Sequence, residues 1–352
     1  MGQQTSATTS LVSRAMVRAG QQALSRAREA GLRLGGLTIA IVIVVVLFTL
    51  LSKPNTFLTV VNALGVVRFM STIAIVGLGL TLVIVVGEID LSFGYTYGLA
   101  STLIATSWII WGWPVFLSIP LAFLVAFCIG AINAMLTTVI KIPSFIVTLG
   151  TGQLIFGTTL VVSSAATLNP AYPPPGRTVS QSEIDWFFGL SNQPLPFGIP
   201  MQGLWMIGIA LIAHFVLTRT LFGFRLKAIG GNPVAAEIAR LPIRKYKFAS
   251  FVICSLLACL AAMLDFAFIG STQPNAGISL LFPVFAAVII GGASLSGGRG
   301  TAIGTLSGAL LLAIISNGLA LLSAGSYLSQ FVSGAVTIAA VVLDRFTQSL
   351  KK

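Results

Sequence analysis

Charged side chains are scarce in this sequence. Of its 352 residues, 8% are charged and 56% are hydrophobic, and the mean hydropathy is +0.99. A soluble protein of this size would carry about a quarter charged residues. The composition therefore excludes a soluble domain and predicts an integral membrane protein.

Histidine and cysteine are also rare. His214 is the only histidine, and its apolar surroundings favour a packing role over a Ser-His-Asp triad. Cys128, Cys254 and Cys259 lie in apolar runs without C-x-x-C spacing, so neither a disulfide nor a metal site is expected. The Gly-rich segment Gly291–Thr301 lacks the G-K-[ST] of an ATP-binding loop. We therefore expect no catalytic residue, no metal and no bound cofactor in this chain.

What the sequence does have is a series of long apolar runs. Most are long enough to cross ~30 Å of hydrocarbon as a helix, and the short alternating segments of membrane β-barrels are not seen. About ten spans are expected, near residues 34–51, 62–86, 94–111, 115–139, 144–164, 202–219, 248–269, 279–293, 302–322 and 327–344. The predicted fold class is all-α integral membrane.

The positions of Lys and Arg predict the orientation, because cytoplasmic loops are enriched in both. With a cytoplasmic N-terminus, all of the 20 basic residues except Lys53, Arg68 and Arg177 fall inside. Both termini are therefore expected in the cytoplasm. The net charge of +12 is interpreted as a topology signal and as contact with lipid headgroups, and nucleic-acid binding is not expected.

The expected organisation follows from these spans. A basic cytoplasmic tail (1–33), part of it an amphipathic helix on the inner leaflet, precedes a polytopic membrane domain (34–345) and a short C-terminal tail (346–352). An outer loop (165–200) is expected to contain a short helix near Ser182–Phe188. This loop either docks a soluble partner or caps the helix bundle.

The central cytoplasmic loop, 220–247, combines polar sequence with dense positive charge. Its Gly-Gly-Asn-Pro turn, followed by Ala-Ala-Glu-Ile-Ala-Arg, predicts a short helix over Asn232–Arg240. A helix displayed on the cytoplasmic face of a membrane protein indicates contact with a soluble partner.

Further polar motifs lie at span ends. In Gly-Glu-Ile-Asp-Leu-Ser, Glu88, Asp90 and Ser92 either cap the third span or act in coupling or gating, because carboxylates near hydrocarbon are costly unless used. Asp265 is expected near the outer interface, where snorkelling is favoured over proton relay.

In their order along the chain, these motifs resemble those of the permease subunits of bacterial ABC importers for simple sugars, the ribose, xylose, arabinose and autoinducer-2 type. The resemblance covers about Val60 to Asp344 and rests on GEIDLSFG, KIPSFIVTLGT, FRLKAIGGNPVAA, STQPNAG and AAVIIGGASLSGGRGTAIGTLSGALLL. It implies a type II ABC importer-like bundle that pairs with a second copy or a paralogue. It also implies a cytoplasmic ABC ATPase that holds the ATP and Mg, and a periplasmic sugar-binding protein.

The resemblance assigns roles to residues. ATPase coupling falls to Gly231, Asn232, Pro233, Ala235, Ala236, Glu237 and Arg240, and a cysteine at Ala236 is expected to cross-link to the ATPase. Candidates to line the translocation path are Asn133, Thr148, Thr151, Gln273, Asn275 and Asn317, each with an interhelical hydrogen bond as the alternative role. Glu88, Asp90 and Ser92 are the gating candidates.

Several positions depart from the family pattern. Arg240 stands where the family usually has glycine, Tyr95 replaces a small residue, and Ala134 follows Asn133 where glycine is common. The stretch directly after Gly277, Ile278–Phe285, lacks the acidic residue usual in the family, which puts the outer part of the family's route in doubt for this chain.

Alternatives remain open. A related permease for nucleosides or branched-chain amino acids would share the architecture, although GEIDLS and GGNPVAA are nearer to the sugar group. A secondary carrier or channel would work without an ATPase. A membrane enzyme would need clustered catalytic groups, and the sequence shows none.

Overall fold

The computed structural model describes residues 35–193, 195–323 and 326–349, and these residues are almost entirely helical. A first helix, Gly35–Leu51, is followed by α2 Val60–Val85, α3 Phe93–Ala105 with a π-helical turn at Thr106–Ile110, α4 Val115–Thr138, α5 Ser144–Ser163, α6 Gln181–Asn192, α7 Met201–Arg219, α8 Leu221–Gly231, α9 Pro233–Ile238, α10 Ile243–Ile269, α11 Leu281–Ile290, α12 Ala302–Leu321 and α13 Ser326–Ser349. The expected amphipathic tail helix lies outside the described residues.

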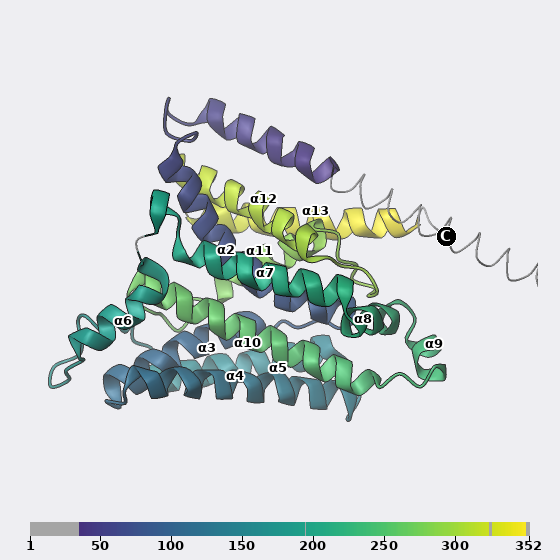
Figure 1. Cartoon of the computed structure of the whole chain (residues 1–352), viewed down its shortest axis with the longest axis horizontal. Coiled ribbons are helices and arrows are strands. Elements are labelled where there is room, and N and C mark those ends of the chain that lie inside the picture. Colours follow the sequence, from purple (N-terminus) through teal and green to yellow (C-terminus); the bar gives the residue numbers. More distant parts are fainter. Residues whose placement is uncertain (1–34, 194, 324–325, 350–352) are drawn as a thin grey trace, which may run out of the picture.

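Each expected span overlaps one of these helices, which confirms the all-helical fold, whereas the number of crossings stays a prediction. Six of them, α2, α4, α5, α7, α10 and α12, are long and apolar enough to cross a membrane by length and composition. The long helices run alongside one another, with α6 at one end of the bundle and α8 and α9 at the other (Figure 1).

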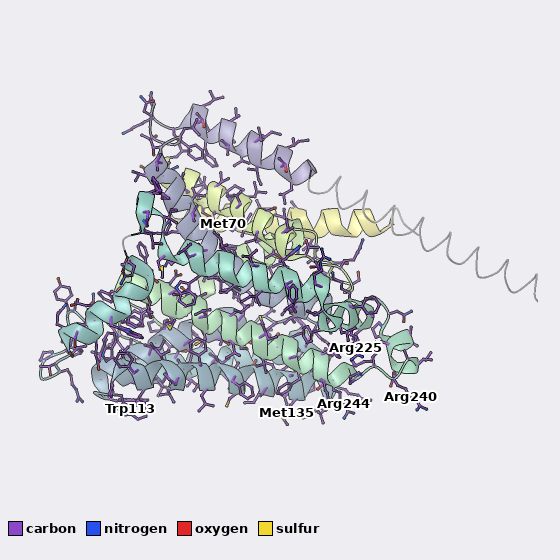
Figure 2. All side chains as sticks on the ribbon, in the orientation of Figure 1. Met70, Trp113, Met135, Arg225, Arg240 and Arg244 are labelled. Atoms are coloured by element: carbon purple, nitrogen blue, oxygen red, sulfur yellow. The ribbon has the colours of Figure 1, made fainter. Side chains whose placement is uncertain are left out.

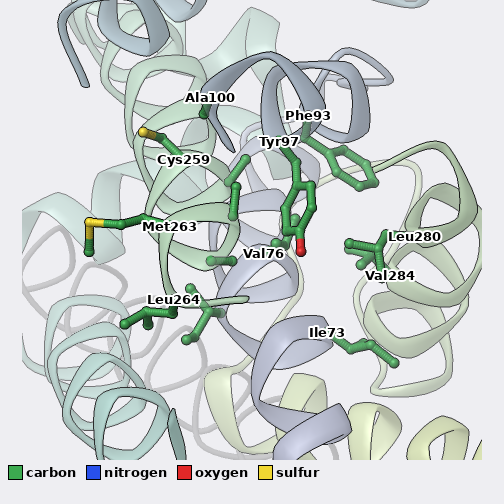
Figure 3. Close-up of a cluster of buried hydrophobic side chains, with 14 of the residues drawn as sticks. Ile73, Val76, Phe93, Tyr97, Ala100, Cys259, Met263, Leu264, Leu280 and Val284 are labelled. Carbon is green, nitrogen blue, oxygen red and sulfur yellow. The ribbon is translucent and has the colours of Figure 1, made fainter. Parts of the chain in front are cut away.

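The core forms around α2 and α10. In the most apolar stretch of α2, 78% of the residues are buried, against 28% in α4, α5 and α7. Side chains from α2, α3, α10 and α11 gather in one cluster, with the ring of Tyr97 among them (Figure 3). Glycines allow this close packing: a methyl group added at Gly130 of α4 would lie 2.7 Å from the Val252 Cα of α10.

Asp265 corrects one expectation, because its side chain is turned into the bundle. Its carboxylate accepts hydrogen bonds from the hydroxyls of Thr72 (2.8 Å) and Tyr97 (2.5 Å) and from the amide of Gln202 (3.3 Å). The carboxylate therefore joins the middle of α2, the first turns of α3, the start of α7 and the last turns of α10. Snorkelling was the wrong expectation because these donors satisfy the carboxylate without water.

The segment expected as the outer loop packs across one end of the bundle (Figure 1). Its helix, α6, is longer than the expected Ser182–Phe188. Phe187 is fully buried against Trp108 and Phe266, and Glu183 accepts a hydrogen bond from the Trp108 indole at 2.6 Å. These contacts fix α6 across the outer ends of α3 and α10.

The central cytoplasmic segment is more helical than expected. Most of its first half forms α8, and the helix expected over Asn232–Arg240 is shorter, spanning Pro233–Ile238. The sequence predicts a loop here because the segment is polar, densely basic and enclosed by two hydrophobic runs. Leu226 and Ile229 are in fact fully buried, so tertiary packing gives this segment its apolar face.

Candidate functional site

The chain between α2 and α3 is a break in helical structure that α5 holds in place. The Ile89 N–H donates to the Ser144 hydroxyl at 3.1 Å, and the Leu91 N–H donates to the Thr148 hydroxyl at 3.0 Å. Backbone groups at membrane depth need such partners, because hydrocarbon offers none. These hydrogen bonds therefore join two of the sequence motifs to each other, Gly-Glu-Ile-Asp-Leu-Ser and Lys-Ile-Pro-Ser-Phe-Ile-Val-Thr.

A buried polar network extends from this break. Asp90 Oδ1 accepts hydrogen bonds from the backbone N–H and the hydroxyl of Ser92, both at 2.7 Å. The Asn133 amide donates to the Ser92 hydroxyl (2.8 Å) and accepts from the Thr151 hydroxyl (2.8 Å). Asp90, Ser92 and Asn133 are fully buried. The network therefore joins the start of α3 to α4 and α5.

The residues predicted for the translocation path fall into separate places. Asn133 and Thr148 are fully buried within the network, and Thr151 is only partly exposed. Gln273 and Asn275 are exposed in the segment after α10, whereas Asn317 lies on α12. Roles in the path remain predictions, and the network residues have interhelical bonds that account for their polarity.

The tip of the molecule that the sequence predicts to be cytoplasmic is built from α8 and α9. Asn232 begins α9 by accepting a hydrogen bond from the Ala235 N–H at 3.0 Å, and Pro233 occupies the first helical position, where its missing N–H costs nothing. Ala236 is the buried residue of this helix, 4% exposed, and belongs to a hydrophobic cluster with Leu226 and Ile229 of α8 and Leu82 of α2. The short helix is thus anchored through one small side chain.

The opposite side of the tip is apolar and open. Val234 is 68% exposed and Ile238, one turn later, is 79% exposed, while Leu221 and Phe224 of α8 are 70% and 72% exposed. Arg225, Arg240 and Arg244 lie at this same end, far from Trp113 (Figure 2). An exposed apolar patch with a charged rim is typical of a protein–protein interface.

Arg240 closes α9 in the left-handed conformation, with φ of 55°. Its N–H donates to the Glu237 carbonyl, and the Leu241 N–H donates to the Ala236 carbonyl, which together form a Schellman motif. Glycine is favoured at this position because a Cβ is strained there. This geometry explains the glycine usual in the family, and Arg240 adopts the same left-handed conformation.

The tip and the break meet at Gly230. A methyl group added there would lie 1.9 Å from the Val85 carbonyl oxygen and 2.7 Å from the Gly298 nitrogen, while the Gly298 N–H donates to Val85 O at 2.9 Å. The end of α8 therefore contacts the end of α2 and the loop 291–301 through backbone atoms. Such contacts transmit displacement because no flexible side chain intervenes.

An ion pair strengthens this junction. Lys247, in the first turns of α10, binds Glu88 in the break between α2 and α3. Sequence reasoning missed the pair between Glu88 and Lys247. The signal available was opposite charge at the same expected membrane face.

A second lysine of this region bonds to the backbone. The Lys227 ammonium of α8 donates to the Leu217 carbonyl at 2.9 Å, and partial burial lowers the pKa of Lys227.

Comparisons with known proteins agree with this arrangement. The family described as "Branched-chain amino acid transport system / permease component" matches residues 62–341. The ribose import permease protein RbsC of Escherichia coli (strain K12) is 33% identical over 313 residues, which cover 88% of this chain and 93% of the relative. RbsC of Bacillus subtilis (strain 168) is 34% identical, with coverage of 88% and 91%. The xylose transport system permease protein XylH of Escherichia coli (strain K12) is 29% identical, with coverage of 88% and 91%.

Proposed function

Because this chain belongs to the permease family of bacterial ABC importers, within its carbohydrate-uptake group, we propose that it carries a monosaccharide or similar small polyol across the inner membrane. It is a multi-pass membrane subunit of the transport machinery and does not itself catalyse a reaction. The family implies an ATPase and a binding protein as partners. ATP and Mg belong to that ATPase.

Support for a sugar comes from the relatives. The family description names branched-chain amino acids, but the relatives that cover most of this chain include ribose and xylose permeases. Escherichia coli RbsC matches almost end to end. A nucleoside or amino acid permease is therefore the second candidate.

The proposed topology has about ten crossings, with both termini in the cytoplasm. Its support is the position of Arg225, Arg240 and Arg244 at the end of the bundle where α8 and α9 lie, whereas Trp113 and α6 lie at the other end (Figures 1 and 2). Cytoplasmic loops are enriched in arginine. The membrane domain then spans residues 34–345, flanked by tails at 1–33 and 346–352, with the outer loop at 165–200 and the coupling loop at 220–247.

The observation that carries the proposal is the anchored, exposed helix α9. Gly231, Asn232, Pro233, Ala235, Ala236, Glu237 and Arg240 would form its contact with the ATPase. Ala236 anchors the helix from within and is buried, so a cross-linker belongs at Val234 or Ile238 instead. That shift corrects the sequence-based choice of Ala236.

In the proposed mechanism, closure of the ATPase on ATP displaces α9 and α8 together. Gly230 passes the displacement to Val85, and Lys247 passes it to Glu88. Both paths end at the break before α3, where Asp90 and Ser92 hold α4 and α5. ATP can drive this change only to the extent that closed ATPase and rearranged permease favour each other.

The permease would act as a dimer with a second copy or a paralogue, and the binding protein would dock at the outer end. α6 is the outer element available for that contact. Membrane lipid surrounds the remaining faces, where leucine, isoleucine and phenylalanine side chains of α4 and α7 are exposed.

Reconstitution tests the proposal. The permease is placed in proteoliposomes with the ATPase and binding protein encoded beside it, and uptake of labelled ribose, xylose and ribitol is measured with and without ATP. ATP-dependent uptake of one of them supports the proposal. Uptake of leucine alone, or uptake of any solute that survives an inactive ATPase, contradicts it.

A further inference from the structure

The face of α5 that no other described helix covers carries a polar residue midway through the span. Gln153 is exposed there, between Gly150 and Gly157, and a methyl group added at either glycine would meet no other atom within 4 Å. An amide facing hydrocarbon at the middle of a membrane is costly. This face is therefore expected to meet water, solute or protein.

An aromatic residue stands beside Gln153. Tyr95, from the first turn of α3, lies so close to Gly152 that a methyl group there would come within 2.6 Å of the ring. The Gln153 amide donates to the Tyr95 hydroxyl at 3.3 Å, and the ring packs near Phe156 with centroids 6.3 Å apart. Glycine at 152 thus makes room for the tyrosine that departs from the family pattern.

The chemistry of this pair suits a neutral polyol. Within the described chain, the Tyr95 hydroxyl proton and the Gln153 carbonyl oxygen have no other partner, so the pair offers one donor and one acceptor beside an aromatic ring. Sugars present hydroxyls and apolar C–H faces together. The hydroxyls can bond to this donor and acceptor, and the C–H faces can pack against the aromatic ring. The helix Ser144–Ser163 contains no charged residue, so an amino acid's two charges would be left unpaired.

We propose that Tyr95 and Gln153 form a contact site for a neutral sugar or polyol midway along the translocation path. The inference rests on the proposed sugar transport and adds the residues that contact the solute in transit. The ring of Phe156, beside that of Tyr95, forms part of the same site. Affinity at this point needs to be only modest, because a site that binds tightly would retain the solute.

Accessibility to reagents tests the site without knowledge of the sugar. Cysteine is introduced as Gln153→Cys in a Cys128→Ala background, since Cys254 and Cys259 are fully buried. The matched control is Leu124→Cys, at a position that is 60% exposed near the middle of α4. The full importer is treated with a charged, membrane-impermeant thiosulfonate and, separately, with a lipophilic maleimide.

The inference predicts that the charged reagent modifies Gln153→Cys and spares Leu124→Cys. Reaction of Gln153→Cys with only the lipophilic reagent would show that this face contacts lipid, which overturns the site. Failure of both reagents would show that a second copy covers the residue, which also overturns it. These results do not depend on which solute is transported, so they separate this inference from the proposed function.

Transport provides the second readout, with whichever of ribose, xylose and ribitol the wild-type importer takes up. Gln153→Leu and Tyr95→Phe should each lower uptake about fivefold, the factor for one hydrogen bond of ~1 kcal/mol. The ATPase activity stimulated by the binding protein should stay unchanged. Unchanged uptake, or a parallel fall in uptake and ATPase activity, would contradict a solute contact.

Discussion

Gly230 of α8 packs directly on the carbonyl group of Val85 of α2. The contact leaves no space for a side chain, because a Cβ at residue 230 would lie 1.9 Å from the Val85 oxygen. It joins the exposed cytoplasmic tip to the break before α3.

Gly230→Ala should break the junction. The methyl group must displace backbone atoms on two sides, and we expect a loss of about 2–4 kcal/mol in the free energy of unfolding together with loss of ATP-driven uptake. Gly231→Ala is the matched control, since its methyl group would have 3.8 Å to the nearest Gly298 atom. Thermal unfolding of both variants in detergent measures the difference. Equal stability of the two would show that the close contact is absent.

Arg240→Gly should stabilise the coupling loop. Arginine at φ of 55° is strained, and removal of its Cβ should gain about 0.5–1 kcal/mol despite the extra freedom of glycine in the unfolded chain. Arg240→Ala keeps the Cβ and should give no such gain. A melting temperature that rises equally in both variants would assign the effect to charge instead of backbone strain.

The ion pair between Glu88 and Lys247 should contribute to coupling. Glu88→Gln and Lys247→Gln are each expected to reduce sugar uptake more than ATPase activity, because the break before α3 loses a link to α10. In a double-mutant cycle on stability, the pair should show a coupling energy of about 0.5–3 kcal/mol. Strictly additive effects of the two substitutions would exclude a functional pair.

Thr148→Val should destabilise the break itself. Valine keeps the shape of threonine but leaves the Leu91 N–H without its acceptor, at an expected cost of about 1–3 kcal/mol. Thr158→Val on the same helix is the control, because Thr158 is exposed and bonds only to Leu154 O within its own helix. Unfolding in mixed micelles should separate the two variants, and a negligible effect at Thr148 would remove its assigned role.

Asp265→Ala should loosen the outer half of the bundle. The substitution leaves the Tyr97 and Thr72 hydroxyls and the Gln202 amide without their shared acceptor, for an expected loss of about 2–3 kcal/mol. Asp185→Ala, at an exposed position of α6, should change stability little. A similarly small loss of stability for both variants would mean that the Asp265 carboxylate does not hold these helices together.

Hydropathy was sufficient to predict the all-α membrane fold, because each run of about 20 apolar residues has few alternatives in a bilayer. It failed for α8, whose apolar side is interrupted by Arg225 and Lys227. It also failed for Asp265: position along a helix predicts depth, but only packing reveals that three donors face the carboxylate. The direction in which each side chain points was therefore the feature that could not be predicted from the sequence.

Some features of the candidate sites were also predictable from the sequence, and others were not. The turn and helix around Asn232 were predictable, since asparagine capping and proline at the first position are local effects. The junction at Gly230 was not, because it joins residues from α2, α8 and the loop near Gly298. Likewise, the sequence shows that Tyr95 replaces a small residue of the family, but only the structure shows that its ring packs against Gly152.

The central claim is that α9 is the surface on which the ATPase acts. A benzophenone maleimide attached to Ile238→Cys, in the Cys128→Ala background, tests it most directly in the assembled importer. The control is Leu211→Cys on α7, at a position 66% exposed, against 79% at Ile238. Illumination should link the ATPase to position 238 and not to position 211. An assembled complex that gives no cross-link from position 238 would contradict the account.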